Sequence, residues 1–178
     1  MDKRGLFEKS EEVKKGQIKL SFGMIFSVIL IVIFLVFAFY AISTFLGIQR
    51  TAEVGVFVDD FRSDVDTMWK SQGGSQEREY NLPSRIEMVC FIDSDADKGT
   101  GSDDGLFEDL KFRALDEDNL VFYPIGSAET ESVEIRNIDI GETTNQENPF
   151  CIENNGGTLE LVLIKEFGEA EVIIKRQE

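Results

Sequence analysis

An uninterrupted apolar stretch lies near the start of the chain, and an amphipathic stretch follows it directly. Residues 20–49 carry no charged side chain, so a helix through them would be about 45 Å long, against about 30 Å for the hydrocarbon core of a bilayer. Beyond Arg50, apolar residues recur at alternating steps of four and three, the spacing of one helix face; they are Val54, Val58, Phe61, Val65 and Met68. Phe57 and Trp69 widen this stripe. The pattern predicts one helix of roughly fifty residues, apolar all round in its first half and on one face in its second.

Strand-like segments replace the helical pattern after a glycine-rich break at residues 71–75. Residues 106–115 fit a short helix and a strand equally well. A phase slip at Asn137, in an otherwise alternating segment, predicts a β-bulge. The last two strand-like segments flank Gly168 and Glu169 and predict a terminal hairpin. The segments with strand character are 86–92, 120–123, 133–140, 159–167 and 170–175.

These patterns predict an α+β fold: a long N-terminal helix, transmembrane and then amphipathic, followed by a small antiparallel β-sheet domain. We place a basic cytoplasmic leader at residues 1–16, the transmembrane helix at 17–50, its amphipathic extension at 51–72 and a β-rich domain at 73–178. About 100 residues remain for that domain, which is enough for one modest core if the amphipathic helix covers one face of the sheet.

The charges on either side of the apolar run predict its orientation. Six basic residues precede residue 20, whereas the chain after the run is rich in acid, beginning with Glu53, Asp59 and Asp60. Positive residues close to a span stay in the cytoplasm. A secretory signal peptide has an apolar region of only about 7–15 residues, shorter than this run. We therefore expect a single-pass protein of the cell membrane with a cytoplasmic N-terminus and an extracytoplasmic C-terminal domain.

Composition narrows the classes of function. After residue 19 the chain holds 12 basic and 30 acidic residues, a formal charge of −18, whereas a nucleic-acid partner requires a basic face. The sequence has no histidine, which removes the usual general base and the commonest zinc ligand. We therefore expect neither nucleic-acid binding nor enzymatic activity. The acidic surface fits solubility and mutual repulsion, and it also fits halophilic adaptation or cation binding.

The two cysteines, Cys90 and Cys151, both lie in apolar, strand-like segments of the part we place outside the membrane. Disulfides form and persist there. A bridge between them would close a loop of about 60 residues, for which the chain-entropy model gives about 4 kcal/mol of stabilisation. We predict this disulfide; two separate buried thiols are the alternative.

A short motif leads into the apolar run, and it reads Lys14-Lys15-Gly16-Gln17-Ile18-Lys19-Leu20-Ser21-Phe22. It resembles the class III signal of archaeal type IV pilins and related pilin-like proteins, in which a basic leader, a glycine and often a glutamine precede a long hydrophobic helix. The resemblance extends to the order of helix and then sheet along the whole chain. It implies cleavage by a prepilin peptidase between Gly16 and Gln17, with the lipid bilayer and other pilin-like subunits as partners. An ordinary uncleaved membrane anchor is the alternative.

The chain departs from the family at the fifth position counted from Gln17, where Ser21 replaces the glutamate. In pilins that carboxylate is thought to meet the terminal amine of a neighbouring subunit inside the apolar filament core, where an unpaired charge is unfavourable. We take Ser21 and the adjacent Phe22 as candidate assembly residues. The absent carboxylate favours a minor or accessory subunit, or an anchor that does not assemble, over the major filament subunit.

A second constellation follows the strand-like segment 86–92. Acidic side chains alternate along it between glycines, a pattern that resembles D-x-D-x-D calcium loops; the candidate ligands are Asp93, Asp95, Asp97, Asp103 and Asp104. It departs from the EF-hand because Lys98 stands at the position of the turn glycine and no glutamate closes the site. A Ca²⁺ site that orders the loop and a solvated acidic loop are equally good interpretations.

Two functions fit these features. The first is a structural, type IV pilin-like subunit, minor or accessory, whose β-rich domain is displayed outside the cell. The alternative is a single-pass, membrane-tethered binding or sensory module, ordered by calcium if the acidic loop binds it, that does not assemble into a filament.

Overall fold

The computed structural model describes residues 22–115 and 117–177 and divides the chain into two compact units, Met1–Thr44 and Phe45–Glu178. The predicted long helix is confirmed: α1 runs without a break over 48 residues. The elements, in chain order, are α1 (Phe22–Trp69), β1 (Gly74–Asn81), β2 (Met88–Phe91), the 3₁₀ helix η1 (Asp104–Leu106), α2 (Phe107–Arg113), β3 (Leu120–Tyr123), β4 (Ser132–Val133), α3 (Ile140–Thr143), β5 (Phe150–Asn155), β6 (Thr158–Lys165) and β7 (Ile173–Arg176).

The second unit is built on a seven-stranded sheet, which confirms the predicted antiparallel α+β fold. Its strands follow the order β1-β6-β5-β2-β3-β4, and β7 pairs with β6 as well. Every ladder between strands is antiparallel. The β5–β6 hairpin turns on Gly156 and Gly157, whose φ angles of 68° and 115° suit glycine far better than other residues. The predicted terminal hairpin is confirmed as β6 and β7, with Ile164 opposite Ile173.

The predicted apolar stripe of α1 forms the centre of the main core. Its five residues and Phe57 are all buried. The Phe61 ring, 0% exposed, lies 5.7 Å from the Phe57 and Tyr80 rings and 5.9 Å from the Phe91 ring, measured between centroids. Burying one such side chain contributes about 1.5–3 kcal/mol relative to leaving it in water. Trp69 was expected to widen the stripe, but it is 39% exposed at the end of α1 because the helix stops there.

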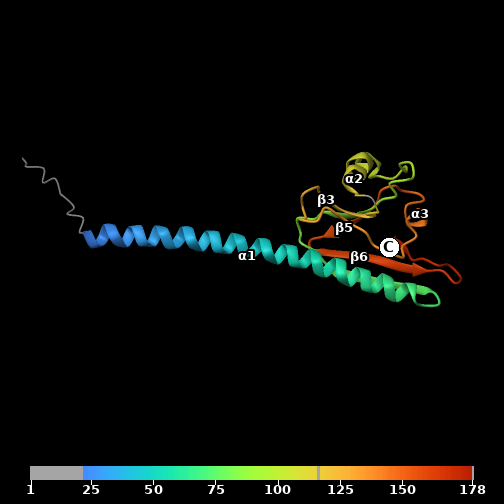
Figure 1. Ribbon diagram of the computed structural model, residues 1–178, viewed down its shortest axis with the longest axis horizontal. Helices are drawn as coiled ribbons and strands as arrows, with labels where there is room; N and C mark the ends of the chain where they lie inside the picture. Colours follow the sequence, from blue (N-terminus) through green and yellow to red (C-terminus); the bar gives the residue numbers. More distant parts are fainter. Residues whose placement is uncertain (1–21, 116, 178) are drawn as a thin grey trace, which may run out of the picture. The chain divides into compact units, whose positions relative to one another are not determined.

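A second, smaller core lies on the other face of the same strands, and in Figure 1 α1 and α2 lie on opposite sides of the sheet. Phe107 and Leu110 of α2 pack there with Cys90, Val121 and Cys151. Because β2 and β3 are buried on both faces, their sequences are continuous apolar runs and not alternating patterns. The ambiguous segment 106–115 is mostly helical, since α2 occupies residues 107–113.

Two strand predictions are corrected by the structure. The segment taken as a glycine-rich break contains the start of β1, which pairs with β6 along its whole length. The segment 133–140 is not a strand: only Val133 belongs to β4, and α3 begins at Ile140. The side-chain amide of Asn119 accepts a hydrogen bond from the Ile135 N–H and donates one to the Ile135 carbonyl, 2.9 Å each, in place of a neighbouring strand. Asn137 then turns the chain with a φ of 65°, so the phase slip marks a turn and not a bulge.

Candidate functional site

The apolar half of α1 holds most of the exposed large apolar side chains that the structure describes. Every residue from 22 to 50 is exposed, including Phe22 at 84%. Two hydroxyls in this stretch donate back to the helix backbone, from Ser27 Oγ to the Gly23 carbonyl at 2.8 Å and from Ser43 Oγ to the Tyr40 carbonyl at 2.9 Å. Polar groups satisfied in this way are tolerated in apolar surroundings. The described residues therefore include one helix long and apolar enough to cross a membrane.

The residues of the leader motif lie outside the described residues. They are Lys14, Lys15, Gly16, Gln17 and the candidate assembly residue Ser21. The other candidate assembly residue, Phe22, is the first residue of α1.

The aspartate-rich loop is organised by a buried amide that the sequence did not single out. Asn148 is 3% exposed, and its Nδ2 donates to the carbonyls of Asp93 at 2.9 Å and Asp97 at 3.1 Å. Its Oδ1 accepts from the Asp93 N–H at 3.1 Å, and its own carbonyl accepts from the Gly99 N–H at 2.9 Å. In the sequence, Asn148 followed by Pro149 indicates a turn. That dipeptide does not indicate that the Asn148 side chain binds the aspartate-rich loop.

The predicted calcium ligands are not brought together by this arrangement. Asp93 Oδ1 accepts from the Asp95 N–H at 3.0 Å and the Ala96 N–H at 3.2 Å, which is a local turn. Asp104 lies 3.6 Å from the ammonium of Lys98. Within residues 22–115 and 117–177, no three acidic side chains converge in a way that would hold a metal ion, and this includes Asp97 and Asp103. The loop is ordered by protein groups, and the Ca²⁺ interpretation gains no geometric support.

The predicted disulfide is present between Cys90 and Cys151, which lie directly opposite each other on β2 and β5. Their Cα atoms are 4.0 Å apart, slightly closer than the usual separation of about 4.4–6.8 Å and far below the limit of about 7 Å beyond which no bridge forms. Arg176 of β7 binds next to it: its Nε donates to the Cys151 carbonyl at 2.9 Å, and its guanidinium lies 2.6 Å from Glu147 and 4.4 Å from the centre of the Phe150 ring. One arginine thereby joins β7 to β5 and to the segment that holds the acidic loop.

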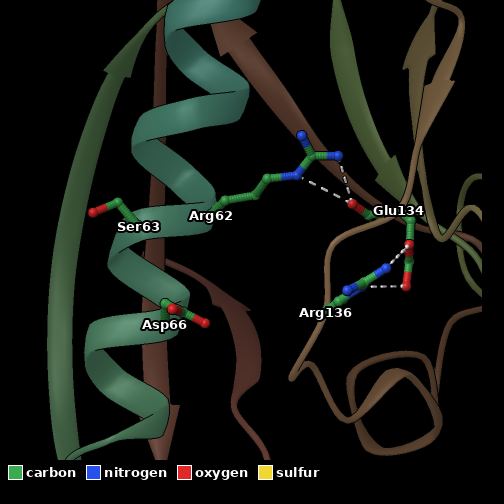
Figure 2. A pocket seen from close by; sticks show the side chains of 5 residues that line it. All are labelled: Arg62, Ser63, Asp66, Glu134 and Arg136. Carbon is green, nitrogen blue, oxygen red and sulfur yellow. Dashed lines mark hydrogen bonds and ion pairs between the residues drawn. The ribbon is translucent and has the colours of Figure 1, made fainter.

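A polar hollow of about 640 Å³ separates α1 from the segment after β4 (Figure 2). Arg62 extends from α1 across it and donates from Nε and Nη2 to the Glu134 carbonyl, at 3.3 and 2.8 Å. The Glu134 carboxylate pairs with Arg136, and this hydrogen-bonded pair raises the pKa of the arginine. One turn along α1, Asp66 accepts from Asn137 Nδ2 at 3.0 Å. These contacts fix α1 to the β4–α3 connection, so the charged side chains are used in packing.

A second, acidic hollow lies where α1 meets the edge strand β1. Tyr80 Oη donates to Asp64 Oδ2 at 2.8 Å, and Arg78 Nε lies 3.3 Å from the same oxygen. Burial, reinforced by the hydrogen bond to Asp64, raises the pKa of Tyr80. The hollow, about 290 Å³, is also lined by Asp60, Ser63, Glu77 and Glu79. This site could not be predicted from the sequence, because β1 was not recognised as a strand.

No protein-family model matches the chain, and neither does any curated protein or solved structure.

Proposed function

We propose that this chain is a type IV pilin-like subunit, minor or accessory, anchored in the cell membrane by the apolar half of α1. Its N-terminus lies in the cytoplasm, and its β-rich domain is displayed outside the cell.

The observation that carries the proposal is the division of α1 into two halves with opposite surroundings. Residues 22–50 expose apolar side chains on every side, whereas Val54 to Met68 bury one face in the core of the sheet domain. Exposed apolar surface is unfavourable in water by about 25 cal/mol per Å², so the first half requires lipid or other helices around it. A helix that lies in apolar surroundings and continues into a domain is the layout that the leader motif implies.

Charge supports the proposed orientation. Six basic residues precede the apolar half, whereas 30 of the 34 acidic residues follow it. A single disulfide in the sheet domain fits an oxidising environment.

The accessory role depends on Ser21. A subunit without a carboxylate there cannot neutralise the terminal amine of its neighbour inside an apolar core, and an unpaired buried charge is strongly unfavourable. Homopolymer formation would therefore lack one stabilising contact, while co-assembly through the apolar surface of α1 is retained.

The length of the mature chain tests this proposal. The full-length chain is produced in membranes together with a prepilin peptidase, extracted with detergent, and analysed by intact mass and N-terminal sequencing. We expect a chain that begins at Gln17, and an uncut chain for a Gly16→Val control. A wild-type chain that begins at Met1 or Asp2 under these conditions would contradict the pilin-like assignment and leave the membrane-tethered module.

The share of this chain in purified surface filaments tests the accessory role separately. We expect a minor share for the wild type and a larger share for Ser21→Glu, which restores the carboxylate. If the wild type begins at Gln17 and is the dominant component, the accessory role is wrong although the pilin-like assignment is right.

A further inference from the structure

Strand β1 forms one edge of the seven-stranded sheet, and in Figure 2 its green ribbon is the outermost strand beside α1. It is eight residues long, and seven of them are exposed or half-buried. The opposite edge strand, β4, has two residues. Long exposed edges are unusual in soluble domains because their free backbone groups can pair with another chain. The open edge of β1 therefore requires an explanation.

The ladder with β6 fixes which backbone groups of β1 are free. In an antiparallel pair, alternate residues direct both their N–H and C=O groups to the partner strand. The Leu82 N–H donates to the Gly157 carbonyl at 2.9 Å, and this pair continues the register of β1 and β6. Counting back from Leu82 in steps of two, the backbone N–H and C=O groups of Tyr80, Arg78 and Gln76 also point toward β6. The residues between them direct their backbone groups outward, and no described backbone group pairs with these; they are Ser75, Glu77, Glu79 and Asn81.

Strand β1 is held in place by the side chains that it directs toward α1. The Tyr80 ring lies 5.4 Å from the Phe57 ring and 5.7 Å from the Phe61 ring of α1. Asp64 of α1 accepts the Tyr80 hydroxyl and pairs with Arg78. A strand fixed in this way loses little conformational freedom when a partner strand is added.

The face of β1 turned away from α1 carries negative charge, and no ion pair to Glu77 or Glu79 is formed among the described residues. Gln177 donates from Nε2 to Glu77 at 3.3 Å, and Lys175 lies two strands away in the same cross-strand row. Glu79 lies directly opposite Glu160 of β6, and Glu77 is two residues away on the same face. Two like charges directly opposite each other on neighbouring strands destabilise the sheet, and a cation placed between them reduces this repulsion. On the α1 side, Asp60 and Asp64 line the hollow beside the strand, where Arg78 is already paired with Asp64.

The same charges decide what occupies the edge. If two copies paired their β1 strands antiparallel about a two-fold axis, the same face of each strand would lie on the same side of the joined sheet. Glu77 and Glu79 of one copy would then lie close to Glu77 and Glu79 of the other, which is unfavourable. A strand with basic side chains at every second position would place a cation against each of them. The charge pattern thus disfavours a second copy and favours a basic segment.

We propose that the free edge of β1 binds an extended, basic segment of a partner protein, which adds an eighth, antiparallel strand to the sheet. Its backbone pairs with Ser75, Glu77, Glu79 and Asn81, and its alternate Lys or Arg side chains pair with Glu77 and Glu79. Main-chain bonds supply affinity in this mode, and alternate side chains supply specificity. The site is independent of filament formation.

The test uses the full-length chain in neutral detergent micelles and an eight-residue peptide in which lysine alternates with threonine and valine. Residue-resolved amide hydrogen exchange is the readout. We expect saturating peptide to slow exchange at Ser75, Glu77 and Glu79 by about tenfold or more, because each amide gains a hydrogen bond. Arg78, already bonded to β6, should change little.

Two control peptides separate strand addition from charge attraction. One carries the same sequence with alternate backbone nitrogens methylated, and the other has glutamate in place of lysine. We expect neither to slow the three amides. Equal slowing by the methylated peptide, or no slowing by the lysine peptide, would overturn the proposal. Slowing that appears without peptide and grows with protein concentration would assign the edge to a second copy and would also overturn it.

Charge-reversal variants complete the test. Glu77→Lys with Glu79→Lys should transfer binding from the lysine peptide to the glutamate peptide. Glu108→Lys with Asp109→Lys, on exposed positions of α2, makes the same change in net charge and should leave lysine-peptide binding within about twofold of the wild type. Equal loss in both double variants would show general attraction to an acidic protein and would refute edge binding.

Discussion

Replacing Phe61 by alanine tests directly whether the amphipathic half of α1 is the central support of the sheet domain. Phe61 is fully buried, and three aromatic rings surround it within 6 Å: Phe57, Tyr80 and Phe91. Truncating a buried phenylalanine to alanine costs about 3–5 kcal/mol, and each aromatic pair contributes about 0.5–1.5 kcal/mol beyond the area buried. Because three such pairs are lost together, we expect about 4–5 kcal/mol, the upper end of the range.

This loss is large for the domain. The free energy of unfolding of a domain is about 5–15 kcal/mol in total, so Phe61→Ala removes about a quarter or more of the stability. At roughly 3–4 °C per kcal/mol for a domain of this size, the melting temperature falls by roughly 12–20 °C. Val56→Ala is the matched control because Val56 lies on the same helix and is 59% exposed. We expect that change to stay within about 0.5 kcal/mol.

The assay is urea unfolding of the full-length chain in detergent, followed by fluorescence of the single tryptophan, Trp69. This residue ends α1, and its carbonyl accepts a hydrogen bond from Lys165 of β6, so its signal reports on the sheet domain. Equal destabilisation by both substitutions, or a loss below about 1 kcal/mol for Phe61→Ala, would refute the packing of α1 on the sheet.

Three further predictions concern other parts of the sheet domain. Gly99→Ala should destabilise it by about 1–3 kcal/mol, because a Cβ there would lie against the backbone nitrogen of Asn148; urea unfolding measures this. Replacing Cys90 and Cys151 together by alanine should cost about 4 kcal/mol in the same assay, since the bridge closes a loop of sequence separation 61. Tyr80→Phe should flatten the alkaline loss of stability: the raised pKa of Tyr80 gives a contribution fully present below about pH 10 and lost as the pH rises further, by up to about 1.4 kcal/mol per pH unit.

Each of these has its own control or contrary outcome. Gly105→Ala, where a Cβ meets nothing within 4 Å, should change the free energy of unfolding by less than about 0.5 kcal/mol; a similar loss at both glycines would contradict the close contact. Dithiothreitol should destabilise the wild type and leave the double alanine variant unchanged. For Tyr80→Phe, unfolding at pH 9 and pH 11 is compared with the wild type, and an identical pH dependence would contradict the raised pKa.

Features set by local periodicity could be predicted from the sequence. The 3.6-residue spacing fixed the buried face of α1, and only Trp69, at the helix end, was placed wrongly. The terminal hairpin followed from two apolar segments around Gly168. The pairing of Cys90 with Cys151 was open to prediction because the chain has no third cysteine.

Features set by distant partners could not be predicted in the same way. The sequence of β1 is polar apart from Tyr80, and it is a strand because β6 pairs with it along its whole length. The segment after Val133 alternates like a strand, yet Asn119 supplies the hydrogen bonds that a neighbouring strand would have made. For the acidic loop the sequence left a Ca²⁺ site and a solvated loop equally open, and it did not indicate that the distant amide of Asn148 binds the loop backbone. In each case the deciding group lies well away in the sequence.

The Cys90–Cys151 disulfide also bears on how the sheet domain would survive cleavage of its backbone. Cys90 and Cys151 enclose the aspartate-rich loop, whose residues 95–98 are exposed and offer a site for protease attack. A single cut there would leave two fragments that remain covalently joined, because each carries one of the bonded cysteines. The β2–β5 ladder and Asn148 would continue to hold the cut ends, so a nicked molecule would keep both its attachment to α1 and most of its sheet.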